Sequence, residues 1–182
     1  MMAETRILDS IFPRVRAEEV DWDDVHRSEL PRVFNYFRYR LSDRALAEDL
    51  TSTTFEKAWR ARAKYRRDRA SVGTWLLSIA RNVAIDHFRA SRNAVPLSDL
   101  PEQPVHPTLD ADLQRGADER RLAGLIQVLP ERERELLALK FGAEETNRAI
   151  ARLTGLSESN VGTILSRTIA TLRDRWQAGG MS

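Results

Sequence analysis

The 182-residue chain contains no cysteine, which excludes disulfide bonds, thiolate metal sites and a thiol redox switch. It also lacks any apolar run near the roughly 20 residues that a membrane-spanning helix needs, so we expect no membrane insertion. Its first residues, MMAETRILDSIF, contain acids and no apolar signal-peptide core. We therefore expect a protein that is not exported and works in the cytoplasm.

The sequence is equally poor in the signatures of enzymes. Its three histidines, His26, His87 and His106, are scattered, and none has the spacing of metal ligands. No nucleophile elbow and no glycine-rich phosphate loop is present. We therefore expect no catalytic residue, no metal, no cofactor and no small-molecule substrate.

Wherever apolar residues recur regularly along the chain, almost all of them do so at helical spacing. No segment alternates apolar and polar residues as a strand would. Apolar residues recur at helical spacing over 22–40, where Pro31 predicts a kink or a helix start. Two further helices are expected after Ser42 and Thr74, each of which could cap a first turn. The pattern predicts an all-α fold.

Proline divides the chain into two parts. Four of its seven prolines fall within residues 93–108, and proline favours extended chain over helix. The helical pattern resumes through Leu129, and Pro130 opens a further helix that closes at Gly142. We therefore expect two small helical domains, at 21–92 and 110–178, joined by a proline-rich linker at 93–109. Residues 1–20 form an extension, either a docking helix or a tail.

Charge is concentrated in the first domain. Residues 57–92 carry ten basic residues against two acids, whereas residues 1–30 carry a surplus of four acids. A basic block of this kind fits a polyanion, although a solvated cationic face would have the same composition. Tyr65, Trp75, His87 and Phe88 lie among the cations, and charge next to aromatic faces suits unpaired bases. Trp75 and Phe88 could equally belong to an ordinary core.

The helix expected after Ser42 has the opposite charge. It carries Asp43, Glu48, Asp49 and Glu56 beside an apolar stripe. In a nucleic-acid-binding protein, an acidic helix must point away from the phosphates. The pattern therefore indicates either a protein-docking face or a solvated face.

The segment 146–176 has the layout of a helix-turn-helix: a short helix, a turn at Gly155 and a longer amphipathic helix. The first turns of the second helix show Ser159, Asn160 and Thr163 rather than long charged side chains. Short donors and acceptors let a backbone approach base edges in the major groove. An αα-corner inside a bundle would give a similar spacing.

The ordered segments AEDLTSTTFEKAW, GTWLLSIARNVAIDHFR and LPERERELLALKF, followed by the helix-turn-helix, resemble the extracytoplasmic function (ECF) group of sigma factors. The resemblance covers residues 22–176. It implies an all-helical promoter-recognition subunit without catalytic activity, whose partners are core RNA polymerase, promoter DNA and an anti-sigma factor. The alternative is a helix-turn-helix regulator that never engages the polymerase.

The resemblance also assigns roles to residues. The residues that it assigns to docking on core polymerase are Glu48, Asp49, Leu50, Thr54, Phe55 and Trp59. Those that it assigns to the −10 element are Lys64, Arg66, Arg67, Arg69, Trp75, Asn82, Asp86 and Arg89. Those that it assigns to the −35 element are Ser157, Glu158, Ser159, Asn160, Thr163 and Arg167.

Three positions depart from the pattern of the group. Ala149 stands where many members carry Glu, and Gly162 and Ile164 stand where Lys and Arg are common. Fewer cations mean fewer phosphate contacts, so we expect weaker or more shape-dependent binding to the −35 element.

Overall fold

The computed structural model describes residues 20–94 and 113–178, with the side chains of 92–94 and 113–115 left aside. Within these residues every regular element is a helix, so the predicted all-α fold is confirmed. The extension at 1–19 and residues 95–112, which include most of the expected linker, lie outside the described residues. The helices are α2 (Trp22–Arg40), α3 (Arg44–Ala61), η1 (Arg62–Lys64), α4 (Val72–Ala94), α5 (Leu113–Gln127), α6 (Glu131–Leu137), η2 (Ala138–Gly142), α7 (Asn147–Thr154) and α8 (Glu158–Ala178).

Carboxylates cap the first two helices. Asp21 accepts hydrogen bonds from the backbone N–H groups of Asp23 and Asp24, so α2 begins at Trp22. The helix runs through Pro31, and the alternative of a helix start there was wrong. Asp43, not the predicted Ser42, caps α3, because its carboxylate accepts from the N–H groups of Ala45 and Leu46.

The start of α4 also differs from the prediction. The helix begins at Val72, and the Ser71 hydroxyl accepts the N–H of Thr74 at 3.2 Å. Thr74, the predicted cap, therefore lies inside the first turn. Its hydroxyl donates to Glu145 at 3.2 Å, a residue of the second half of the chain.

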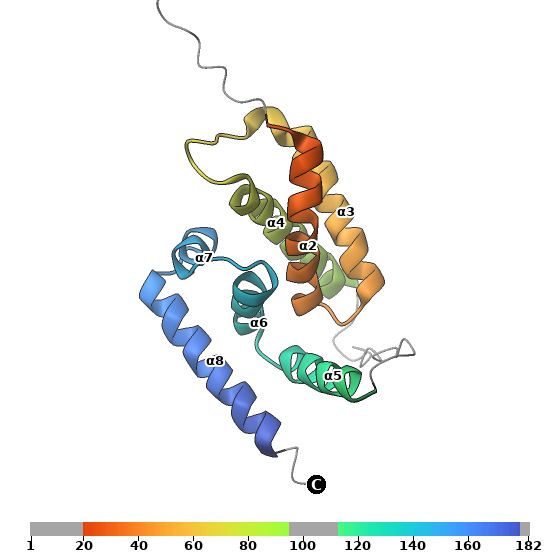
Figure 1. Cartoon of the computed structure of the whole chain (residues 1–182), viewed down its shortest axis with the longest axis vertical. Coiled ribbons are helices and arrows are strands. Elements are labelled where there is room, and N and C mark those ends of the chain that lie inside the picture. The colour runs from red at the N-terminus through yellow and green to blue at the C-terminus, as the bar shows by residue number, and fades with distance from the viewer. Residues whose placement is uncertain (1–19, 95–112, 179–182) are drawn as a thin grey trace, which may run out of the picture.

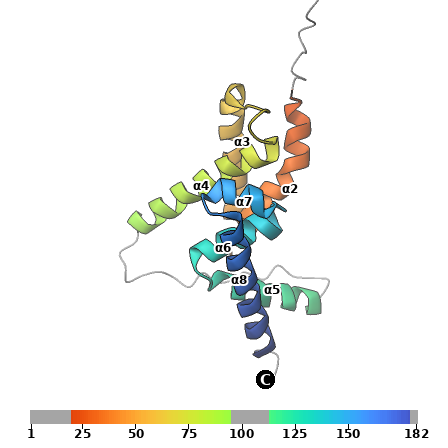
Figure 2. The ribbon, with the colours of Figure 1, turned by 90° about the vertical axis from the view of Figure 1, so that its left-hand side faces the viewer.

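The helices form two units. α2, α3, η1 and α4 form the N-terminal unit, and α5, α6, η2, α7 and α8 form the C-terminal unit, the lower part of Figure 1. Fully buried side chains lie in both units, and the buried apolar residues form one continuous cluster across them. α2 packs on η2 and α6, and α4 packs on α7. Figure 2 shows α7 beside α2 and α4 from a second direction.

The contact between the units is close at one glycine. A methyl group placed on Gly142 of η2 would lie 2.8 Å from the carbonyl oxygen of Asn35 in α2. Only a residue without a side chain allows the two backbones to approach so closely. The sequence predicted two bundles with a tether, and it did not predict this mutual packing.

Candidate nucleic-acid interface

The helix-turn-helix is formed by α7 and α8. Thr146 caps α7 by accepting the N–H of Ala149 at 3.2 Å. Gly155 ends it with a φ of 76°, in the left-handed region that favours glycine, and its N–H donates to the Ala151 carbonyl. The turn predicted at Gly155 is confirmed, and α8 begins three residues later.

Apolar residues of α7, of the turn and of α8 pack the two helices together. Ile150 and Val161 are fully buried and Leu165 nearly so, while Leu153 and Leu156 are half-buried against the same core. This packing fixes the angle between α7 and α8. The polar side of α8 is thereby left on the surface.

The residues assigned to the −35 element form what we call the recognition face, and all of them are exposed: Ser157, Glu158, Ser159, Asn160, Thr163 and Arg167. The Ser157 hydroxyl accepts the N–H of Asn160 at 3.2 Å and so caps α8. Thr163 donates its hydroxyl to the Ser159 carbonyl at 3.0 Å. Apart from Glu158 and Arg167 the side chains of this face are short, so a duplex could approach the backbone closely.

A second polar face runs along α4. Trp75, Asn82, Asp86 and Arg89 follow one another at steps of seven, four and three residues, so they share one side of the helix, which we call the reading stripe. Asn82, Asp86 and Arg89 are exposed, and Trp75 is half-buried. Asp86 also lies 3.6 Å from the Lys57 ammonium of α3. The stripe therefore places an amide, a carboxylate and a guanidinium on one side of α4.

The basic loop, residues 64–71, precedes the reading stripe. Its four assigned cations are all exposed: Lys64, Arg66, Arg67 and Arg69. Arg66 donates to both carboxylate oxygens of Asp68, at 3.1 and 3.3 Å, and this hydrogen bonding lowers the pKa of Asp68. Asp68 therefore stays ionised at neutral pH and offsets one of the loop cations.

Three aromatic rings cluster where this loop meets α2 and α4, and one of them, Tyr65, belongs to the loop. Trp75 lies 5.9 Å from Trp22 and 5.3 Å from Tyr65, measured between ring centroids. The Tyr65 hydroxyl donates to the Ala70 carbonyl at 3.1 Å, which closes the loop. Trp22 of α2 belongs to this cluster and also packs against the hydrophobic core. Only the fold brings it beside Trp75.

Phe88, a further aromatic residue of α4 considered for base stacking, is half-buried and packs against the core. Its ring lies 4.9 Å from the Arg40 guanidinium, and Arg40 is only 2% exposed. Phe88 therefore contributes to packing between helices, as the alternative interpretation held.

The acidic side of α3 forms the candidate docking face for a protein. Glu48 and Asp49 are exposed, Leu50 and Phe55 are half-buried, and the Trp59 ring is 53% exposed. Thr54 differs from its neighbours, because it is fully buried and donates its hydroxyl to the Leu50 carbonyl at 2.7 Å. It packs α3 against the core and cannot contact a partner.

Three residues that the sequence did not single out border this docking face. His26 of α2 contacts Phe55 edge-on at 4.6 Å, and the nearby Leu30 is partly exposed. The Arg62 guanidinium lies 4.0 Å from the centroid of the Trp59 ring. The surface therefore combines acids, exposed apolar area and one stacked cation. Nothing in the sequence predicts that α2 borders the docking face.

Among the described residues, no group of three His, Cys, Asp or Glu side chains could hold a metal ion. None of the helices in the described ranges is both long and apolar enough to cross a bilayer.

Family models match both units. The model of Sigma-70 region 2 matches residues 25–94, and that of Sigma-70, region 4 matches residues 119–172. The first match covers the docking face, the basic loop and the reading stripe. The second covers the recognition face.

Several curated relatives are ECF RNA polymerase sigma factors. The chain is 32% identical to RpoE of Cereibacter sphaeroides, over 85% of this chain and 83% of that protein. It is 27% identical to SigM of Bacillus subtilis, over 86% and 96% of the two chains. It is 29% identical to BldN of Streptomyces coelicolor, of whose length it spans 63%. The chain therefore belongs to the ECF group of the sigma-70 family.

Solved structures agree on the fold. The sigma factor RpoE of Bartonella quintana, solved with the anti-sigma factor NepR, superposes with a TM-score of 0.72 over 86% of this chain and 97% of that one, at 20% identity. CnrH, solved with the cytosolic domain of CnrY, gives a TM-score of 0.58 over 85% and 84% of the two chains, at 21% identity. The protein is a sigma factor, the class of subunit that directs RNA polymerase to promoters.

Proposed function

We propose that three surfaces of this chain divide the work of promoter-specific initiation. The docking face of α3 binds core RNA polymerase. The basic loop and the reading stripe bind the −10 element, and the recognition face of α8 binds the −35 element. The proposal rests mainly on one observation: the acids of α3, the cations of the basic loop and the short polar residues of α8 are all exposed, each on a separate element.

DNA opening would be driven by binding energy alone. Extruding one base costs a few kcal/mol. Stacking of a base on an aromatic ring returns about 1–3 kcal/mol, and phosphate contacts of Lys64 and Arg69 add to this. The half-buried Trp75 is the ring best placed for such stacking, since it lies directly after the basic loop. We infer that the chain has no catalytic activity of its own.

Binding to the −35 element should be comparatively weak. Ala149 is buried and offers no charge, and Gly162 lies close to the Asn147 side chain in the crossing of α7 and α8. Arg167 is the cation that the recognition face offers to a phosphate or a guanine. With few cations near the groove, −35 affinity should depend weakly on salt.

We further propose that an anti-sigma factor binds this chain, as the anti-sigma factor NepR binds the similar sigma factor RpoE; the similar chain CnrH is likewise solved with a partner, the cytosolic domain of CnrY. A cytoplasmic location follows from the proposed partner, because RNA polymerase works there. The proposed boundaries of the functional parts remain 21–92 and 110–178, joined by a linker at 93–109. The role of residues 1–20 stays open between a docking helix and a tail.

The docking face can be tested by pull-down and run-off transcription with purified core polymerase. Asp49→Arg combined with Trp59→Ala reverses a charge and removes an exposed ring on the surface of α3, so the fold should tolerate both changes. Core binding and transcription should fall at least about tenfold, which corresponds to about 1.4 kcal/mol. Asp118→Arg, the same charge reversal at an exposed site on α5, is the matched control and should leave both unchanged.

The alternative function is a DNA-binding regulator that does not engage polymerase. It predicts duplex binding by the recognition face with no retention of core polymerase and no promoter-dependent transcript. If the double variant of α3 transcribes as well as the parent chain, the docking face is misassigned.

A further inference from the structure

A cavity of about 420 Å³ lies on the flank of α8, beside the recognition face, and we call it the flank pocket. Its α8 wall contains Gly162, Ser166 and Arg173, which follow at steps of four and seven residues and so share one side of the helix. Gly162 directly precedes Thr163 of the recognition face, and one residue turns a helix by about 100°. Pockets that hold small ligands have volumes of about 300–1,000 Å³. The flank pocket therefore has the size of a small-molecule site.

Glycine keeps one end of this pocket open. A methyl group on Gly162 would lie 3.5 Å from the Asn147 Nδ2 atom of α7 and would meet nothing else within 4 Å. Because Gly162 lines the pocket, a longer side chain there would occupy its space. The Oδ1 atom of Asn147 is buried and accepts no hydrogen bond within the described residues. The protein therefore leaves this amide unsatisfied, with its Nδ2 donor toward Gly162.

The middle of the pocket is apolar. Leu165 is 5% exposed and Ile169 is half-buried, and both belong to the side of α8 that meets the core. Phe141, at the end of η2, also lines the pocket, and its ring is 47% exposed. A ligand with an apolar body would remove this ring from water, which favours binding.

The charged groups of the pocket are all cationic. Lys140 and Arg173 line it, and none of its lining residues is acidic. Arg173 is exposed and lies eleven residues after Gly162, or about 16 Å along the helix. Hydrogen-bond donors therefore lie at both ends of the apolar stretch, the Asn147 amide at one end and the guanidinium at the other. Such a site suits an anion with acceptor atoms at its ends.

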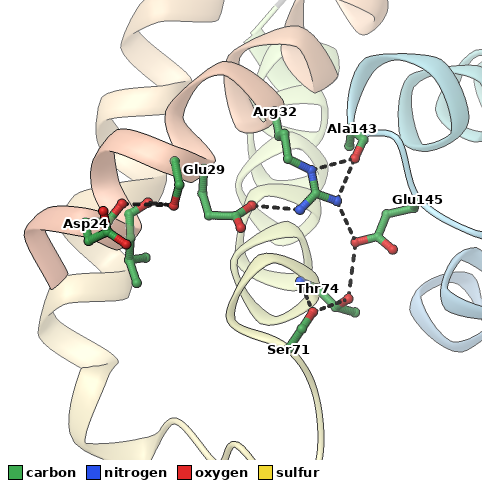
Figure 3. A network of polar contacts seen from close by, with 9 residues as sticks. Asp24, Glu29, Arg32, Ser71, Thr74, Ala143 and Glu145 are labelled. Atoms are coloured by element: carbon green, nitrogen blue, oxygen red, sulfur yellow. Dashed lines mark hydrogen bonds and ion pairs between the residues drawn. The ribbon is translucent and has the colours of Figure 1, made fainter. Parts of the chain in front are cut away.

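The wall near η2 is held in place by polar contacts (Figure 3). Arg32 of α2 donates to the Ala143 carbonyl at 2.7 and 2.9 Å and to the Glu145 carboxylate at 3.3 Å. The same Glu145 oxygen accepts the Thr74 hydroxyl of α4 at 3.2 Å. The Lys140 ammonium donates to the Glu145 carbonyl at 3.4 Å and keeps further N–H donors for a ligand. A site that is already formed loses less conformational entropy when a ligand binds.

We propose that the flank pocket binds a small amphipathic organic anion, with a narrow apolar body and a carboxylate or phosphate at each end. The apolar body lies against the Phe141 ring, and the charged ends accept hydrogen bonds from Arg173 and from Asn147, with Lys140 as the second cation. The sugar–phosphate backbone of a duplex is another anion near α8, but it has no apolar body to cover an exposed phenyl ring. The proposed site does not depend on the DNA-binding roles proposed above.

The experiment titrates three compounds into the full chain and measures the affinity by calorimetry. The probe is sebacate, a linear dicarboxylate. The linear diol of the same length keeps the apolar body and lacks the charges. Succinate keeps both carboxylates and lacks most of the apolar body. Sebacate should bind one molecule per chain, at least about tenfold more tightly than either of the other compounds.

Two pocket variants test where sebacate binds. Gly162→Met fills one end of the pocket, and Gly124→Met is its matched control, because a methyl group on Gly124 of α5 meets nothing within 4 Å. Arg173→Gln removes the cation at the other end, and Arg175→Gln removes an exposed arginine from another side of α8. Both pocket variants should bind sebacate at least about tenfold more weakly than the parent chain, and both controls should bind it as the parent does.

Three results would overturn the proposal. If the parent chain did not bind sebacate, or bound the diol equally well, the pocket would not recognise an amphipathic anion. If both pocket variants bound sebacate as tightly as the parent, the compound would bind elsewhere, such as on the basic loop. If sebacate did not bind but both pocket variants changed the salt dependence of duplex binding, the pocket would hold DNA phosphates instead.

Discussion

The Ser157 hydroxyl accepts the backbone N–H of Asn160 at 3.2 Å and closes the first turn of α8. This one hydrogen bond fixes the helix end that carries the recognition face. Ser157→Ala should lower the free energy of unfolding by about 1 kcal/mol and weaken binding to a −35 duplex, since a frayed first turn displaces Ser159 and Asn160. Denaturant unfolding and fluorescence anisotropy measure the two effects. Ser166→Ala, at an exposed position further along α8, should change neither the stability nor the affinity.

Arg167 should account for much of the electrostatic part of −35 binding. Arg167→Ala should weaken binding across all sequences if it contacts a phosphate, and reduce the slope of log affinity against log salt by about 1. Arg175→Ala, exposed near the end of α8, is the matched control. An unchanged slope in the Arg167 variant would place this side chain away from the DNA.

The basic loop should matter most for unpaired DNA. Arg69→Ala should reduce affinity for a single-stranded −10 oligonucleotide, with a loss of about 0.7 in the salt slope per phosphate contact removed. Arg27→Ala, an exposed arginine of α2, removes the same charge elsewhere. Equal losses in the two variants would indicate only a general charge effect and would contradict a specific role of the loop.

Tyr36 should make the folded protein less stable at alkaline pH. Complete burial raises the pKa of Tyr36 above its ordinary value of 10.0, although Arg40 opposes this. Below pH 10 the group is protonated in both states. Above pH 10 the unfolded chain loses the proton while the folded chain keeps it, so stability must fall.

Denaturant unfolding from pH 9 to 11 tests this prediction. Tyr36→Phe should flatten the decline above pH 10, with a loss of about 1.5–3 kcal/mol at neutral pH, because it removes the hydrogen bond that Arg40 donates to the Tyr36 hydroxyl at 2.8 Å. Tyr39→Phe, half-buried on the same helix, should keep the decline. If the free energy of unfolding of the Tyr36 variant still fell above pH 10, other groups would cause the loss of stability.

The helix-turn-helix could be predicted because its signals are local. Gly155, the Ser157 cap and the spacing of Ile150, Val161 and Leu165 all lie within one short segment, and each has a direct physical meaning. Two helix starts were misplaced for a similarly local reason. Asp43 accepts the N–H groups of Ala45 and Leu46, and Ser71 accepts that of Thr74, so the helices start beside Asp43 and Ser71 rather than at Ser42 and Thr74. Both members of each pair are good cap residues, and only geometry decides between them.

The packing of the two units could not be predicted from the sequence. The contacts that make it join residues far apart along the chain: Arg81 and Glu135 are 54 positions apart, and Arg32 and Glu145 are 113. Charged residues at such positions are compatible with a solvated surface. Likewise, the burial of Thr54 and the position of Trp22 beside Trp75 follow from how α2, α3 and α4 cross.

We expect this one chain to position RNA polymerase on two separate stretches of a promoter. Hydroxyl-radical footprinting and permanganate reactivity, with the chain and core polymerase on a fragment that supports run-off transcription, test it directly. We expect two chain-dependent protected stretches about 25 base pairs apart, about 85 Å along the duplex, with unpaired bases at the downstream one. A single protected stretch that the chain produces without polymerase, and no unpaired base, would contradict the account.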